Sequence, residues 1–157
     1  SFTKNLGLSV NQMRDPQPGE DVFLMGYPLV GIFGDVYPTI SEGIVSKSFG
    51  FQEANNGFIL TASMNPGNSG GPIFGADGSI VGLAVAKLDK QEFLENRGTL
   101  PEDVNSAIKS RSIKAFLKDE LIRPHKVGME AKPKNFDARS VYASNQGSVV
   151  LVVVEEK

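Results

Sequence analysis

The chain has 157 residues, of which 40% are apolar and 22% charged, with 17 glycines, 9 prolines and no cysteine. This length and apolar content suit one compact domain and exclude an intrinsically disordered chain. The lack of cysteine excludes a disulfide scaffold, a thiolate nucleophile and a thiolate metal site. The single histidine, His125, argues against a multi-histidine metal site, so we expect no metal.

The net charge of −2 argues against a general affinity for nucleic acid. The longest purely apolar run, Val149–Val154, is far shorter than the ~20 residues that cross a bilayer. No charged segment followed by an apolar stretch opens the chain, so no signal peptide is visible. We therefore expect neither a nucleic-acid partner nor a membrane span.

Clusters of turn residues divide the first part of the chain into short apolar segments. Asn55-Asn56-Gly57 and Ala76-Asp77-Gly78 are typical of tight turns between strands. We predict strands at 21–27, 39–49, 58–62, 72–74 and 79–86, and one more short strand at 104–108. Many short strands with no helical pattern between them indicate an antiparallel barrel or sandwich.

The last third of the chain has a different character. The polar stretch 87–103 is predicted to be a surface loop. Ser110 suits the N-cap of a helix, whose apolar residues recur with helical spacing at Ile113, Phe116, Leu117 and Leu121. A Lys-rich linker follows at 124–136. Within the remainder, 137–157, the Val/Leu run 147–154 predicts one more strand, buried on both faces.

The most informative stretch is Asn65–Pro72, in which glycines surround a single serine. Glycine tolerates a positive φ and lets a substrate approach the backbone closely. A loop of this kind can aim the N–H groups of Gly67 and Ser69 at one point, which is an oxyanion hole beside a hydroxyl. Composition alone also allows a plainer interpretation, a glycine-rich turn with an incidental serine.

The glycine and serine spacing at 67–71 also matches the nucleophile elbow of α/β-hydrolases. Asp119 and His125 follow in the order that such an enzyme needs. The elbow requires a helix after the serine, however, and here Pro72 leads into a short strand. Because the chain also lacks an alternating strand–helix pattern, we reject this interpretation.

The stretch 65–72 resembles the nucleophile loop of trypsin-like serine proteases, in the variant found in HtrA-like (Deg) proteases. The resemblance continues in chain order through 18–28, 39–46, 58–63, 77–82 and 106–108, and then through the helix that begins at Ser110. It implies an all-β fold: a six-stranded antiparallel Greek-key β-barrel with a C-terminal α-helix at 18–123, plus an extra C-terminal strand. The stretch 1–17 is then a lead-in segment to the second of the family's two barrels.

The resemblance also implies the roles of individual residues. Ser69 becomes the nucleophile, and the N–H groups of Gly67 and Ser69 hold the oxyanion, with Asn68 shaping the loop. The primary specificity pocket is lined by Ser63 and Met64 and, on its opposite wall, by Leu83, Ala84 and Val85. An apolar Met64 suggests a preference for a small or medium apolar side chain. The implied substrate is a polypeptide, and no cofactor is needed.

The catalytic base is missing from this pattern. In the family, the His and the Asp that orients it come from the first barrel, and here the lead-in contains no His. A serine without a base is a poor nucleophile, so we expect the chain to be inactive until a first barrel, in cis or in trans, supplies both groups. His125 follows the helix, where the family places no catalytic group, and is predicted to be an exposed linker residue. Asp15, Asp35 and Asp77 are predicted to be turn residues.

The tail allows two interpretations. Ser140-Val141-Tyr142 followed by 147–153 resembles the opening of an HtrA-like protease domain, where a short helix leads into the first strand. It then implies tandem domains, with 137–157 as the start of the next. Alternatively, the run adds an edge strand to this barrel. An exposed strand at 147–154 also predicts a homo-oligomer formed by strand pairing.

Two hypotheses of function follow. The chain is a fragment of a trypsin-like serine endopeptidase that carries the nucleophile and the oxyanion loop. Alternatively, it is a non-catalytic, degenerate module that binds peptides or proteins. The intact stretch 67–71 favours the enzyme, because a discarded active site has no need to keep its serine.

Overall fold

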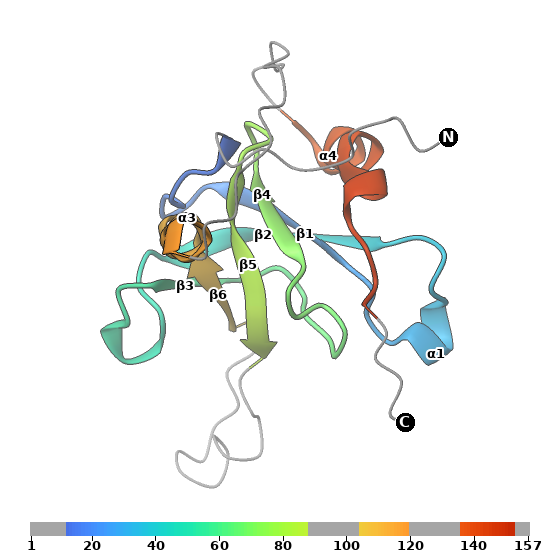
Figure 1. Ribbon diagram of the computed structural model, residues 1–157, viewed down its shortest axis with the longest axis horizontal. Helices are drawn as coiled ribbons and strands as arrows, with labels where there is room; N and C mark the ends of the chain where they lie inside the picture. Colours follow the sequence, from blue (N-terminus) through green and yellow to red (C-terminus); the bar gives the residue numbers. More distant parts are fainter. Residues whose placement is uncertain (1–11, 88–103, 120–135, 153–157) are drawn as a thin grey trace, which may run out of the picture.

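The computed structural model describes residues 12–87, 104–119 and 136–152. Its centre is a closed antiparallel barrel in the order β1-β2-β3-β6-β5-β4 (Figure 1). The strands are β1 (Asp21–Gly26), β2 (Thr39–Lys47), β3 (Gly57–Leu60), β4 (Pro72–Gly75), β5 (Ile80–Lys87) and β6 (Asn105–Lys109). All six strands predicted for the barrel are present, which confirms the expected six-stranded fold.

The helices lie outside the barrel. The predicted helix is confirmed as α3 (Ser110–Asp119), which follows β6 directly. The hydroxyl of its first residue, Ser110, donates to the Ile80 carbonyl at 2.6 Å and so ties the helix to β5. The other helical elements are α1 (Val30–Phe33), η2 (Phe51–Glu53), α4 (Ala138–Asn145) and η3 (Gln146–Ser148). None of the helices in the described ranges is long and apolar enough to span a membrane.

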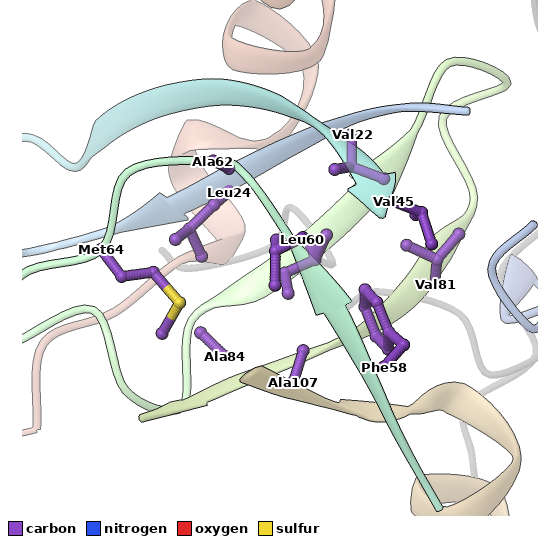
Figure 2. Close-up of a cluster of buried hydrophobic side chains, with 11 residues drawn as sticks. Val22, Leu24, Val45, Phe58, Leu60, Ala62, Met64, Val81, Ala84 and Ala107 are labelled. Atoms are coloured by element: carbon purple, nitrogen blue, oxygen red, sulfur yellow. The ribbon is translucent and has the colours of Figure 1, made fainter. Parts of the chain in front are cut away.

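Residues on alternate positions of the strands fill the interior of the barrel. Phe58 of β3 has no exposed surface, and Figure 2 shows its ring within the interior cluster, toward the end at which Val45 lies. This interior cluster consists of Val22, Leu24, Val45, Phe58, Leu60, Ala62, Met64, Ile73, Val81, Ala84 and Ala107. Met64 lies near one end of the barrel and Val45 near the other (Figure 2).

The outer face of β1 is buried as well. Phe23 and Met25 point away from the interior and pack, with Tyr27 just beyond the strand, against Val141 of α4 and against Val149. The segment from α4 onward runs down the side of the barrel on which β1 lies (Figure 1). This outer cluster is completed by buried Phe74 and Ile80, with partly buried residues around it. The C-terminal segment 136–152 therefore belongs to the packing of this barrel.

The structure differs from the prediction of an extra strand at 147–154. Gln146–Ser148 forms a 3₁₀ turn, and the described residues that follow, 149–152, join no sheet. The reason is packing: Val149 turns its side chain into the outer cluster, and its carbonyl accepts a hydrogen bond from the Tyr27 hydroxyl at 3.2 Å. A tertiary contact has overridden the β-propensity of the valine run. Residues 153 and 154 lie outside the described residues.

Arg14 ties the lead-in segment to the turn between β4 and β5. Its guanidinium donates to both carboxylate oxygens of Asp77, at 2.8 and 3.1 Å, and pairs with Glu20 at 2.9 Å. The Asp77 carboxylate also accepts hydrogen bonds from the N–H and the hydroxyl of Ser79. Asp77 is thus a turn residue, as predicted, and it holds the turn to a segment 63 positions away in the chain.

This arrangement predicts a specific acid sensitivity. Partial burial raises the pKa of the Asp77 carboxyl, but the hydrogen bonds from Arg14 and Ser79 outweigh it and lower the pKa from 3.8 to about 2. The carboxylate therefore stabilises the fold above its unfolded pKa, and this stabilisation is lost as the pH falls toward about 2. We expect Asp77→Asn to be less stable than the wild type at neutral pH and to converge with it in strong acid. Urea unfolding between pH 7 and 2 measures this, and a constant difference across that range contradicts it.

Candidate functional site

The serine-bearing loop lies between β3 and β4 and is fastened to β5. The exposed Ser69 donates its hydroxyl hydrogen to the Val85 carbonyl at 2.8 Å. Beside it, the Gly70 N–H donates to the Ala84 carbonyl at 2.7 Å, and the Ala84 N–H donates to the Gly71 carbonyl at 2.9 Å. These three hydrogen bonds hold the serine against the end of β5.

The backbone of the loop fits closely onto the end of β1. Gly67 has a φ of +100°, and a Cβ built there would lie 2.3 Å from the Tyr27 carbonyl oxygen. A Cβ on Gly71 would lie 2.2 Å from the Met25 carbonyl oxygen. Only glycine fits at both positions, because real Cβ atoms do not approach a carbonyl so closely. Within the described residues, neither the Gly67 N–H nor the Ser69 N–H donates to an acceptor.

Asn68 is a buried polar residue of the loop, with 4% of its surface exposed. Its N–H donates to the Asn65 carbonyl at 3.0 Å, which closes a tight turn. Its side chain packs over Gly26, where a Cβ would lie 2.8 Å from Asn68 Oδ1. This oxygen is buried and finds no hydrogen-bond partner among the described residues. The Asn68 side chain thus lies on the inner side of the loop, against the end of β1.

The residues predicted to line a substrate pocket divide into two groups. Met64 and Ala84 are buried together at one end of the interior cluster (Figure 2). Val85 is exposed and accepts the Ser69 hydroxyl hydrogen, so it lies directly beside the serine. Ser63 is exposed, with its carbonyl bound to the Ser41 hydroxyl at 2.8 Å, and Leu83 is partly buried. Ser63 and Leu83 therefore belong neither to the Met64–Ala84 pair nor to the contact between Val85 and Ser69.

Sequence reasoning did not anticipate Asn105 at the start of β6. Its side chain is buried, with 2% exposed, and its Nδ2 donates to the Ala62 carbonyl at 2.8 Å, next to Ser63. Its Oδ1 has no partner among the described residues. The available signal was the alternation along β6, which places Asn105 on the same inward face as Ala107.

Residues 27–29 were also missed as neighbours of the loop. Leu29 adopts the left-handed conformation, with φ +50°, and its N–H donates to the Pro66 carbonyl at 3.0 Å. No local pattern predicts this contact, because it joins positions 37 residues apart whose pairing depends on the whole barrel.

The described part of the chain offers Ser69 no base. Its hydroxyl is bound to a carbonyl, which accepts a hydrogen bond but cannot take up a proton near neutral pH. His125 lies outside the described residues, and so does most of the predicted loop 87–103. Across residues 12–87, 104–119 and 136–152, no three His, Cys, Asp or Glu side chains gather as a metal site.

Comparisons with known proteins show the family of the chain. A family model described as a trypsin-like peptidase domain matches residues 3–83. The serine protease Do-like HtrA of Bacillus subtilis is 31% identical over 139 residues, covering 78% of this chain and 28% of its own length. An uncharacterized protein of Sinorhizobium fredii, y4bJ, is 33% identical over 106 residues, covering 68% of this chain and 17% of its own.

A solved structure supports the same relationship. The serine endoprotease from Yersinia pestis superposes with a TM-score of 0.51 at 26% identity, over 74% of this chain and 35% of that one. The chain thus spans less than a third of the two curated relatives and about a third of this structure. With the family model matching just over half of its residues and a closed six-stranded barrel, the chain belongs to the trypsin-like peptidase family, as a partial, HtrA-like copy of that fold.

Proposed function

We propose that this chain is the second barrel of a serine endopeptidase and that Ser69 is its nucleophile. The Gly67 and Ser69 N–H groups are the oxyanion donors, and Asn68 shapes the loop that carries them. Ser63, Met64, Leu83, Ala84 and Val85 line the pocket for the substrate side chain. The substrate is a polypeptide, and the reaction is acyl transfer to the serine followed by hydrolysis.

The observation that carries this proposal is the geometry around Ser69. Its hydroxyl is exposed, is held against Val85, and lies next to N–H groups that donate to no described acceptor. Such N–H groups stabilise the oxyanion that forms when a serine attacks a carbonyl. The positive φ of Gly67, at +100°, gives the loop a conformation that only glycine adopts at low cost.

The same geometry leads us to propose that the chain alone is inactive. The Ser69 hydroxyl hydrogen is directed at a carbonyl, so no proton acceptor activates the oxygen for attack. A first barrel, from the same protein or from another chain, supplies the His and Asp. Placing an imidazole against Ser69 requires the hydroxyl to rotate away from the Val85 carbonyl.

A non-catalytic module that binds peptides is the second candidate. The observation in its favour is the lack of a base beside Ser69 within the described residues. In this case the loop and the neighbouring Val85 serve only to hold an extended peptide. The two candidates differ in whether Ser69 can be activated, and this difference can be measured.

Reaction with a fluorophosphonate probe, with and without excess imidazole, separates them. Attack by the Ser69 oxygen on phosphorus expels fluoride, and imidazole takes the place of the missing base. We expect no labelling of the 157-residue chain alone and slow labelling with imidazole. Ser69→Ala abolishes this labelling, whereas Ser46→Ala, at an exposed serine of β2 outside the site, retains it.

Each alternative result has a defined meaning. Labelling of Ser69 without imidazole shows that a base is present within the chain, and His125 becomes the first residue to replace. Labelling that never depends on Ser69, even at high imidazole, contradicts the nucleophile and favours the binding module.

A further inference from the structure

We propose that Tyr27 is a positioning residue through which the C-terminal segment 136–152 fixes the conformation of the oxyanion loop. This inference rests on the proposed function of the loop at Gly67–Gly71. The segment thus contributes to the active site of this barrel, although it reaches none of the reacting atoms.

The oxyanion loop, Gly67–Gly71, is in close contact with the end of β1. The loop lies on the backbone of Met25–Tyr27: the Gly71 and Gly67 Cα atoms face the Met25 and Tyr27 carbonyl oxygens at distances that exclude a Cβ. The Leu29 N–H continues the contact with its hydrogen bond to the Pro66 carbonyl. The loop therefore has no freedom to move without the chain at 25–29.

The outer cluster holds Met25–Tyr27 in place. The Met25 and Tyr27 side chains belong to the outer cluster, where Val141 is fully buried and Val149 is 7% exposed. The Tyr27 hydroxyl donates a buried hydrogen bond to the Val149 carbonyl, across 122 positions of the chain. The backbone of Tyr27 thus contacts the oxyanion loop, and its side chain is held by the C-terminal segment.

Release of the C-terminal segment from Tyr27 would loosen the oxyanion loop. Protein interiors are close-packed, so a small displacement of one buried group displaces the groups packed against it. When the segment leaves Tyr27, the ring loses its apolar neighbours and its hydroxyl loses its acceptor. The Tyr27 carbonyl is then free to shift against Gly67, the residue whose N–H we assign to the oxyanion. Docking of the segment therefore orders the loop.

Native-state hydrogen exchange of the 157-residue chain tests this coupling. The Gly70 and Gly71 N–H groups are hydrogen-bonded to the Ala84 and Asn68 carbonyls, so their exchange reports opening of the loop. Tyr27→Phe keeps the ring and removes one hydrogen bond. We expect both amides to exchange about fivefold faster relative to the amides of β3, as for the loss of one hydrogen bond. Tyr142→Phe is the control, since Tyr142 lies in the same cluster and its hydroxyl donates to no described residue.

A second pair of variants separates positioning from general stability. Val141 and Val45 are both fully or almost fully buried, the first in the outer cluster and the second in the interior cluster. Val141→Ala is expected to accelerate exchange of the two glycine amides selectively. Val45→Ala, at the far end of the barrel from Met64 (Figure 2), is expected to accelerate all amides equally.

The outcomes are distinct from those of the labelling experiment. The inference is overturned when Tyr27→Phe and Val141→Ala leave the glycine amides unchanged relative to β3, or when Val45→Ala changes them as selectively. Hydrogen exchange requires no reaction at Ser69. If labelling fails while Tyr27→Phe still accelerates exchange of the glycine amides, only the assignment of Ser69 as the nucleophile is contradicted. Normal labelling without coupling contradicts only the role of Tyr27.

Discussion

Phe58→Ala is expected to lower the free energy of unfolding by about 3–5 kcal/mol, a large part of the total for a domain of this size. Phe58 has no exposed surface and belongs to the interior cluster. Its ring is also packed against Gly82, where a Cβ would lie 2.5 Å from the ring. No side chain at Gly82 can expand into the space that the ring leaves. Urea unfolding followed by circular dichroism measures the loss.

Phe33→Ala is the matched control. Phe33 lies in α1 with 62% of its surface exposed, so the same truncation removes little buried area. We expect a change within about 0.5 kcal/mol, as for most surface substitutions. Equal losses in the two variants contradict a stability that depends on the interior of the barrel.

Gly67→Ala is expected to have the largest effect on the functional site. The new methyl group would lie 2.3 Å from the Tyr27 carbonyl oxygen. In addition, the alanine would have to adopt a φ of +100°, which L-residues rarely do. Strain and overpacking together cost about 3 kcal/mol. Because a backbone carbonyl cannot move aside alone, the loop must shift. We therefore expect lower stability, displaced amide resonances throughout 67–71, and loss of any imidazole-dependent labelling of Ser69.

Gly70→Ala isolates the contribution of the clash. Gly70 also has a positive φ, +82°, but a Cβ there meets nothing within 4 Å. Only the conformational strain remains, and it costs about 1 kcal/mol. Similar losses of stability in the two variants indicate that the contact between Gly67 and Tyr27 is not tight. A larger loss for Gly67→Ala supports the close fit on which the proposed positioning by Tyr27 depends.

The barrel could be predicted from sequence because its signals are local. Alternating apolar residues and turns such as Asp77-Gly78 define each strand within a few residues. The order in which the strands pair to close the barrel is not a local signal, because the pairing of β3 with β6 and of β1 with β4 joins distant segments. The resemblance to a known family implied a six-stranded Greek-key barrel, and the strand order itself comes from the structure.

The elements that were not predicted have tertiary causes. α1 has only four residues and no side-chain cap, and it follows Leu29 in a left-handed conformation. Residues 149–152 have strong β-propensity, yet Val149 packs into the outer cluster. β1 is buried on both faces, because the C-terminal segment covers its outer face. Hydrophobic pattern alone does not reveal which segment covers and which is covered.

The loop at 65–72 could be predicted as a motif, but its neighbours could not. Glycine and serine spacing identifies the loop without saying what it rests on. The contacts of Ser69 with Val85, of Gly67 with Tyr27 and of Pro66 with Leu29 each join separate segments of the chain. A search for the site by sequence therefore finds the residues that react and misses those that hold them.

Closure of the sheet has a consequence for self-association. Each of the six strands has a hydrogen-bonded neighbour on both sides, so none of them is an edge strand of the kind that an incoming strand extends. Pairing of a second copy's C-terminal segment with a strand of this barrel would require an existing strand pair to open. Association through that segment can instead exchange one outer cluster for another, with Val141 and Val149 of one copy covering Phe23 and Met25 of its neighbour. Such a dimer would keep every backbone pairing of the monomer and differ only in which chain covers β1.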